Sequence, residues 1–366
     1  MQTRIHGPDI LRGFAALGVV LFHVHYLSGI NPSPIAGALF GRFDFLVRLF
    51  FSISAFSIFY AYFKRLETQG ELRKFYKNRF FRIAPLFYVV LFTTIAINYI
   101  HNSTLPDLYE FILSITFLFP FVPGKHGSIV GGGWSLGVEW VFYIFLPLLL
   151  CLIRTWRSAI VVWTLTCTVS AFRYSYFNVD NMPSQLREYG ILFFLSHLPF
   201  FIVGIACFWA IQEKQSNKKD MPITKTLRGC IIVSCFLFLI IYFRNQWSNY
   251  IAEEFVISAA SYVLLRVSTF TLPIWIDNKL SRYLGSISYS VYLTQFPVIS
   301  LLYINGVYSK IQENFPNTTT AYATASSITL ILVLLISSLS YKYIERPMIN
   351  FGKANPRQLP STNPLN

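Results

Sequence analysis

Long apolar runs recur along this chain, and short polar segments between them hold most of the charged residues. A helix of about 20 predominantly apolar residues is long enough to cross the hydrocarbon core of a bilayer, so runs of this kind predict membrane-spanning helices. The fold class we expect is therefore an all-α polytopic integral membrane protein. We expect ten such helices, over residues 10–30, 45–63, 83–101, 134–153, 158–177, 191–211, 229–244, 255–276, 285–305 and 321–343.

A further apolar segment, residues 109–123, differs from these runs. It is short, Pro120 and Pro123 interrupt it, and three glycines follow at 131–133. A segment of this length is typical of a re-entrant or interfacial helix rather than of a span. Ten spans place both termini on one side of the membrane. With that side in the cytoplasm, most of the 30 Lys and Arg lie in cytoplasmic loops, as the positive-inside rule requires.

The composition agrees with this class, because 54% of the residues are hydrophobic and only 13% are charged. The net charge of +14 does not indicate a nucleic-acid partner, since the basic residues gather in the predicted cytoplasmic loops. The five cysteines lie in or beside apolar runs without metal-ligand spacing, so we expect no metal site. Residues 1–350 form one predicted transmembrane domain, and the proline-rich segment 351–366 is predicted to be a disordered cytoplasmic tail.

The first apolar run carries two ionisable side chains, Arg12 and His23, that share one helix face. They are eleven residues apart, which at roughly 100° per residue is three turns and about 20°, so the side chains lie roughly 16 Å apart along that face. An ionisable group at membrane depth indicates a functional site by default. Taken singly, Arg12 also fits a side chain that reaches the headgroups, and His23 also fits a packing histidine. The shared face favours a joint function.

The basic loop at 64–82 ends in Arg79-Phe80-Phe81-Arg82. Residues three apart are neighbours on a helix, so Arg79 and Arg82 would present two guanidinium groups together at the membrane surface, an arrangement suited to phosphate oxygens. A topological anchor that attracts anionic lipid is the alternative, and this segment alone favours the anchor.

The run at 134–153 has a polar face made of Ser135, Glu139 and Tyr143, which recur every four residues. A carboxylate at this depth requires a partner such as arginine or a protonated imidazole, or contact with water. Trp134 precedes this face near the expected outer surface, where tryptophan is typical of the interfacial belt.

The run at 285–305 also has a polar face, made of Ser288, Tyr292 and Gln295. These groups form hydrogen bonds but do not transfer protons near neutral pH. They are therefore candidates either for holding a substrate or for bonding neighbouring helices, and the second role is the simpler interpretation.

Six stretches follow one another along the chain: Arg12 and His23 with ten residues between them, FFSISAFSI at 50–58, Arg79-Phe80-Phe81-Arg82, WSLGVEWVFY at 134–143, LGSISYSVYL at 284–293 and YKYIERP at 341–347. In this order they resemble the motifs of the membrane-bound acyltransferase family 3, which includes bacterial O-acetyltransferases of cell-surface carbohydrates. Two residues depart from the family pattern: Ala55 replaces a glycine, which should still allow close helix packing, and Gln295 replaces a common histidine.

The resemblance implies transfer of an acyl group to a hydroxyl of a cell-surface or lipid-linked carbohydrate, such as an O-antigen, by a multi-pass protein of the bacterial inner membrane. The expected donor is acetyl-CoA entering from the cytoplasm. The chain resembles the stand-alone members, which lack a soluble esterase-like domain. A small-molecule acceptor stays open as an alternative.

The resemblance also implies roles for the candidate residues. Arg79 and Arg82, with Arg12 deeper, would hold the donor's phosphates, and His23 would be the general base. Glu139 would orient or stabilise the imidazole. If the family's histidine takes part in proton transfer, its replacement at position 295 strengthens the assignment of His23. The candidates for substrate binding are Trp134, Ser135, Tyr143, Tyr292 and Gln295.

A transporter or flippase for a polysaccharide precursor is the alternative from another class. It would also need buried arginine, histidine and glutamate facing a cavity. No internal repeat is visible in the sequence, however, and an arginine pair at the cytoplasmic side suits a phosphorylated cofactor better.

Overall fold

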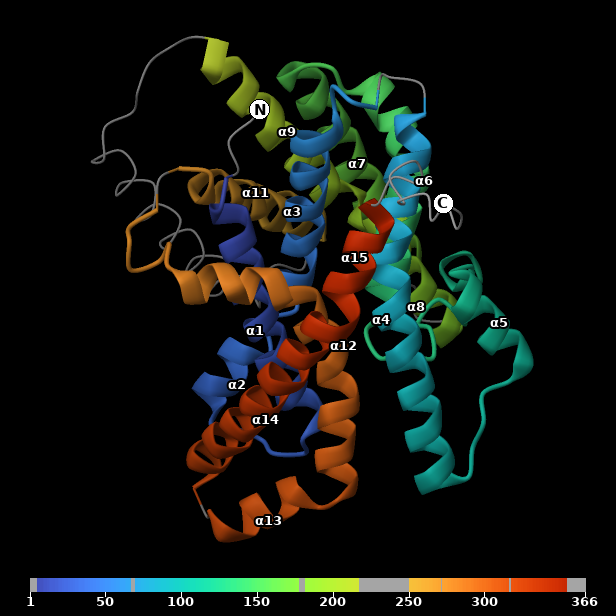
Figure 1. Cartoon of the computed structure of the whole chain (residues 1–366), viewed down its shortest axis with the longest axis vertical. Helices are drawn as coiled ribbons and strands as arrows, with labels where there is room; N and C mark the ends of the chain where they lie inside the picture. Colours follow the sequence, from blue (N-terminus) through green and yellow to red (C-terminus); the bar gives the residue numbers. More distant parts are fainter. Residues whose placement is uncertain are drawn as a thin grey trace, which may run out of the picture.

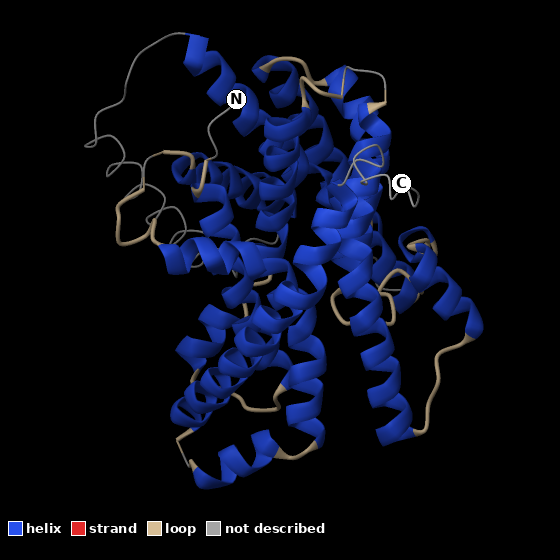
Figure 2. Cartoon of the chain, in the orientation of Figure 1, coloured by secondary structure: helices blue, strands red, loops and turns tan. Residues whose placement is uncertain are grey.

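The computed structural model describes residues 5–66, 70–177, 182–216, 250–270, 272–315 and 317–353, and every regular element in these ranges is helical (Figure 2). The elements are α1 Gly7–Leu27, α2 Pro34–Phe40, α3 Phe45–Tyr62, α4 Glu71–Asn102, α5 Leu108–Thr116, η1 Phe119–Phe121, α6 Gly133–Leu152, α7 Trp156–Phe177, α8 Ser184–Leu192, α9 Phe194–Ser216, α11 Tyr250–Ser268, α12 Lys279–Ile304, α13 Val307–Asn314, α14 Thr318–Ser340, the π-helical turn η3 Tyr341–Glu345 and α15 Arg346–Lys353.

Seven helical stretches of the described chain are long and apolar enough to cross a membrane, and they coincide with seven of the predicted spans. They are Gly7–Leu27, Pro34–Tyr62, Glu71–Asn102, Gly133–Leu152, Ser184–Glu213, Lys279–Ile304 and Thr318–Lys353.

Three predicted spans are not among these seven. Those at 158–177 and 255–276 correspond to α7 and α11, which are helical but carry arginines or glutamates along their length. The predicted span at 229–244 lies outside the described residues, as does most of the predicted tail, of which only residues 351–353 are described, as the end of α15. The count of ten spans and the cytoplasmic termini therefore stay predictions.

The segment at 109–123 contains only short helices. Helix α5 has nine residues and ends at Thr116. The next residue, Phe117, has a left-handed backbone at φ 56°, and the three-residue turn η1 follows. Neither is long enough to span a bilayer, in agreement with a re-entrant or interfacial segment. Figure 1 shows α5 at one side of the helix bundle.

The bundle contains two packed groups of helices (Figure 1). Helices α1, α12 and α14 form one group around a small aliphatic core, and α3, α7, α9 and α11 form the other. The larger hydrophobic core joins the second group to α4 and α6 and is rich in phenylalanine. Because α1 also contacts α3, the two groups meet along a seam that is bordered by α4 and α6.

Small residues allow the helices within each group to approach closely. A methyl group added at Gly285 of α12 would lie 2.2 Å from the backbone oxygen of Asp9, and one at Gly13 would lie 2.7 Å from the backbone nitrogen of Gly285. In the other group, a methyl at Gly204 would lie 3.0 Å from the side chain of Ala55, which is fully buried. Close packing at Ala55 was expected from the sequence, and the structure confirms it.

We predict that Gly285→Ala destabilises the protein. The added methyl meets backbone rather than a movable side chain, so α1 and α12 must separate, at a cost of about 1–3 kcal/mol. Thermal unfolding in detergent measures the effect. Gly127→Ala is the matched control, because a methyl there has no neighbour within 4 Å. Equal melting temperatures for the two variants would contradict the close approach of α1 and α12.

Candidate active site

A cavity of about 390 Å³ lies in the seam between the two helix groups. Its walls come from α1, α3, α4, α6 and α12, and α15 contributes to the wall as well. Six charged side chains line it, four of them cationic and two anionic. The cavity therefore has an excess of positive charge and suits an anionic ligand. The cations are Arg12, Arg79, Arg82 and Lys353, and the anions are Asp9 and Glu139.

Most of the predicted site residues meet at this cavity although they come from distant parts of the sequence. Arg79 and Arg82 both line it from α4, so their three-residue spacing does bring them to one place. The predicted polar face of α6 also lines it as a unit. The predicted residues on the lining are Arg12, Arg79, Arg82, Ser135, Glu139, Tyr143 and Tyr292, whereas His23, Trp134 and Gln295 are not on it.

Two of the arginines are held by different kinds of contact. Nη2 of Arg12 donates to Oγ of Ser57 at 3.3 Å, and Nη1 lies 3.7 Å from Oδ1 of Asp9. The guanidinium of Arg79 lies over three aromatic rings, at 5.4 Å from the ring centre of Phe75 and 5.6 Å from those of Tyr62 and Tyr143. Cation–π contacts of this kind hold a guanidinium in place while leaving its N–H groups available to a ligand.

Glu139 is held by hydroxyl groups. Its Oε1 accepts hydrogen bonds from Oγ of Ser54 at 2.5 Å and from the phenol of Tyr143, one turn along α6, at 2.6 Å. The sequence led us to expect an arginine, a protonated imidazole or water beside it, and the described contacts of His23 do not include Glu139. The carboxylate lines the same cavity as the three arginines.

His23 is oriented by Gln295. Nδ1 of His23 lies 3.1 Å from Oε1 of Gln295, and Nε2 of Gln295 donates to the backbone oxygen of Tyr292 at 2.8 Å. Because the amide nitrogen is already committed as a donor, Oε1 is the acceptor and Nδ1 of His23 carries the proton. The neutral imidazole then has its lone pair on Nε2, which is the form that a general base requires.

Two of the three residues on the predicted polar face of α12 bond to neighbouring helices, as the simpler interpretation predicted, whereas Ser288 bonds to Gly285 within α12. The phenol of Tyr292 lies 2.6 Å from Oγ of Ser135 and donates to the backbone oxygen of Gly132 at 3.1 Å, which joins α12 to the start of α6. Gln295, fully buried, joins α12 to α1. Tyr292 also lines the cavity, so it stays a candidate for holding a substrate.

Trp134 packs inside the protein. Its ring lies 5.2 Å from that of the buried His197 and 6.3 Å from that of Phe51. The structure therefore brings Trp134 to the wall behind the cavity, through Phe51, and not to the cavity itself.

A second cavity, of about 480 Å³, lies beyond His23 along α1 and α12. It is formed by the C-terminal ends of α1, α4 and α12, and Asn98, Tyr26 and Tyr303 are on its lining. Phe296 borders it, and the Phe296 ring also contacts the imidazole of His23, with ring centres 4.6 Å apart. His23 thus lies between the two cavities, because Arg12 lines the first and Tyr26 lines the second on the same helix.

Sequence analysis missed Glu345 as part of the site. Its side chain is 1% exposed and accepts a hydrogen bond from Oγ of Ser290 at 2.7 Å. It is also the carboxylate that acts most strongly on the guanidinium of Arg82. Glu345, like Glu139, is a carboxylate beside apolar residues, and this signal in the sequence also marks it as a candidate. Ser54 and Ser57 were missed because their stretch was used only as a family mark.

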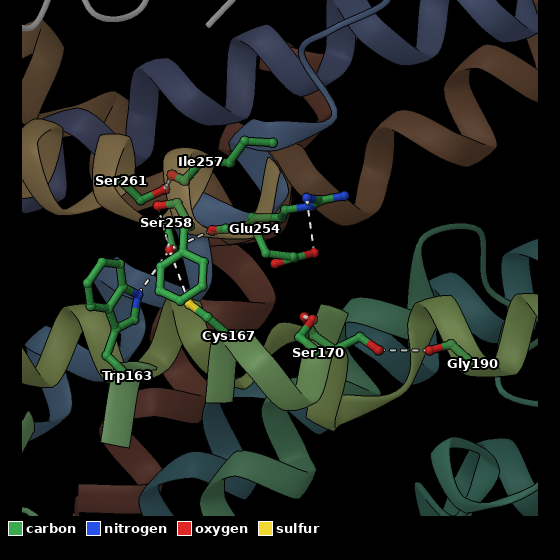
Figure 3. A network of polar contacts seen from close by, with 11 residues as sticks. Trp163, Cys167, Ser170, Gly190, Glu254, Ile257, Ser258 and Ser261 are labelled. Atoms are coloured by element: carbon green, nitrogen blue, oxygen red, sulfur yellow. Dashed lines mark hydrogen bonds and ion pairs between the residues drawn. The ribbon is translucent and has the colours of Figure 1, made fainter. Parts of the chain in front are cut away.

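Another buried polar network lies away from both cavities (Figure 3). Nε1 of Trp163 donates to Oγ of Ser258 at 3.0 Å, and Oγ of Ser258 donates to the backbone oxygen of Glu254 at 2.6 Å. Nη1 of Arg48 lies 3.7 Å from Oε1 of Glu254. These contacts join α3, α7 and α11, so the network stabilises the second helix group rather than the site.

The comparisons with known proteins agree with one another. A family described as an acyltransferase domain matches residues 5–339. A protein of Acidianus two-tailed virus, named provisionally as an acetyltransferase, is 26% identical over 302 residues, which cover 81% of this chain and 84% of the relative.

Two bacterial relatives are longer than this chain. A protein of Staphylococcus aureus (strain COL), named provisionally as an O-acetyltransferase, is 25% identical over an alignment of 391 positions, which covers 95% of this chain and 58% of the relative. A protein of Bacillus subtilis (strain 168), named provisionally as a peptidoglycan O-acetyltransferase, is 23% identical over an alignment of 383 positions, which covers 95% of this chain and 55% of the relative. The chain thus spans a little over half the length of these two relatives. No solved structure matches it.

Proposed function

The chain belongs to the acyltransferase family, whose domain it carries over residues 5–339, and on that premise we propose that it transfers an acetyl group from acetyl-CoA to a hydroxyl of a carbohydrate. The observation that carries this proposal is the cation-rich cavity next to an oriented histidine. The setting is a bacterial inner membrane, with the first cavity open to the cytoplasm and the second to the outer side. O-Acetyltransferases among the relatives support the same reaction class.

The donor's phosphates bind to the arginines of the first cavity. Arg79 and Arg82 form the main contacts and Arg12 lies deeper, while Lys353 of α15 adds a fourth cation. Guanidinium groups suit phosphate because they donate two parallel hydrogen bonds and keep their charge. In a site largely screened from water, these contacts are stronger than in bulk solvent.

The reaction is a single acyl transfer. A hydroxyl of the acceptor donates to Nε2 of His23, which takes its proton as the oxygen attacks the thioester carbon. The carbon–oxygen bond forms, the carbon–sulfur bond breaks, and the thiolate of CoA leaves and receives the proton from the imidazolium. Gln295 keeps the imidazole in the tautomer that can accept the proton.

The acceptor binds in the second cavity. Tyr26 and Tyr303 offer aromatic faces to a sugar ring, and Asn98 and Ser300 offer hydrogen-bonding groups. A carbohydrate acceptor also agrees with the relative whose name refers to peptidoglycan. A hydroxyl that enters from this side approaches His23 past the ring of Phe296.

We predict that His23→Ala lowers kcat on the order of 10²-fold or more, because it removes the general base. Acetylation of the acceptor in membranes that contain equal amounts of each variant measures the effect. His25→Ala is the matched control, since His25 lies on the same helix two residues away and lines neither cavity. Equal losses in the two variants, or full activity of His23→Ala, would refute the assignment.

We predict that replacing Arg79 and Arg82 together by Gln raises KM for acetyl-CoA more than KM for the acceptor, because the phosphates lose their charged partners. Steady-state kinetics with each substrate varied in turn measures both constants. Arg73→Gln is the control, because Arg73 is exposed on the same helix and lines neither cavity. If the double variant changes only the amount of inserted protein, the two arginines are topological anchors.

We predict that the acceptor reaches its site from outside the cell, and single cysteines test this in a background without the native cysteines. An impermeant thiol reagent applied to intact spheroplasts should label Ser300→Cys, which lines the second cavity, and should stop acetylation. The same reagent should not label Asn78→Cys, which lines the first. Labelling of Asn78→Cys alone would show that the protein has the opposite orientation in the membrane. Full labelling of Ser300→Cys with unchanged acetylation would exclude the second cavity as the acceptor site.

A further inference from the structure

The two cavities are separated by one turn of α12. Tyr292 borders the first cavity, and Phe296, four residues later, borders the second. Four residues of a helix rise by about 6 Å, so the separating layer is only one or two side chains thick. His23 lies beside this layer and lines neither cavity.

Tyr292 closes the layer on the side of the first cavity. Its phenol lies 2.6 Å from Oγ of Ser135 and donates to the backbone oxygen of Gly132, so the side chain is tied to the start of α6. Ser135 also lines the first cavity. The inner end of that cavity is therefore bounded by a hydrogen-bonded pair.

Phe296 fills the layer on the side of the second cavity. A methyl group added at Gly131 would lie 2.4 Å from Cδ1 of its ring, and one at Gly132, whose φ is +68°, would lie 2.6 Å from Cε2 and Cζ. The two glycines thus provide the space that the ring occupies, directly beside the imidazole of His23. An acyl group that the proposed reaction delivers to His23 from the first cavity therefore comes to lie beside this ring.

We propose that Phe296 determines the size of the acyl group that the protein accepts, an inference that rests on the proposed function. For the acceptor oxygen at His23 to bond to the thioester carbon, that carbon and the rest of its acyl group must enter the layer. An acetyl group adds one methyl beyond the carbonyl and needs the smallest movement of the ring. Propionyl and butyryl groups add further methylenes that meet the ring, and each is rejected by about tenfold or more.

The test is the affinity of the purified full-length protein in nanodiscs for CoA, acetyl-CoA, propionyl-CoA and butyryl-CoA, measured by isothermal titration. This readout does not depend on the identity of the acceptor. The wild-type protein should bind butyryl-CoA at least tenfold more weakly than acetyl-CoA. Phe296→Ala should bring the two affinities within about threefold, and Phe296→Leu, which keeps an apolar side chain there, should fall between.

Phe22→Ala is the matched control, because Phe22 also contacts the ring of His23, at 5.1 Å, but borders neither cavity. The Phe22→Ala variant should bind butyryl-CoA more weakly than acetyl-CoA by the same factor as the wild-type protein. Unchanged discrimination in Phe296→Ala and Phe296→Leu, with CoA still bound, would overturn the inference and leave the proposed function standing. The same loss of discrimination in Phe22→Ala would also overturn it. Failure of the wild-type protein to bind CoA would overturn the proposed function and this inference with it.

Discussion

The constraint on which the rest of this structure depends is the cost of placing three guanidinium groups inside a bundle of apolar helices. An arginine at such depth needs partners or water, and the protein supplies them from other helices. Arg12 of α1 bonds to α3 through Ser57, Arg79 of α4 lies over Tyr143 of α6, and Arg82 of α4 lines the same cavity, within electrostatic range of Glu345 in the π-helical turn before α15. Satisfying the arginines therefore draws these helices toward one cavity.

The partners do not cancel the charge. The carboxylates on the lining are outnumbered by the cations, and Glu139 is further occupied by hydrogen bonds from Ser54 and Tyr143. The hydroxyl groups fix the carboxylate without neutralising it, and the aromatic rings fix Arg79 without using its donors. A cavity built in this way is preorganised for an anion, because its charges need little rearrangement when a phosphorylated ligand enters. Packing elsewhere in the protein, in particular in the phenylalanine-rich core, offsets the energetic cost of the unbalanced charge.

Sequence reasoning predicted which residues share a helix face far better than which faces meet. The periodicity of α6 identified Ser135, Glu139 and Tyr143 as one face, and all three line the cavity. It contained no information on the opposing helix, so it left open whether Glu139 bonds to a hydroxyl, a guanidinium or an imidazole. The bond between His23 and Gln295 joins residues 272 positions apart, a pairing that only tertiary packing defines. Hydropathy likewise found the seven helical stretches of the described residues that are long and apolar enough to cross a membrane, but it could not establish how α7 and α11, which carry ionisable side chains, lie relative to the bilayer.

The glutamine at position 295 limits the proton-transfer paths that are open to His23, compared with the histidine of the family pattern. A histidine there, as the family resemblance would place it, has two ring nitrogens and can pass a proton on. Gln295 cannot, because its amide nitrogen donates to Tyr292 and its oxygen accepts from His23, so both ends are fixed. No relay runs from Nδ1 of His23 through this side chain. In the reaction that we propose, the proton that Nε2 takes from an acceptor hydroxyl leaves from Nε2 again and passes to the departing thiolate. In this proposed reaction one imidazole serves as base for the attack and as acid for the leaving group, and the glutamine contributes by holding its tautomer constant.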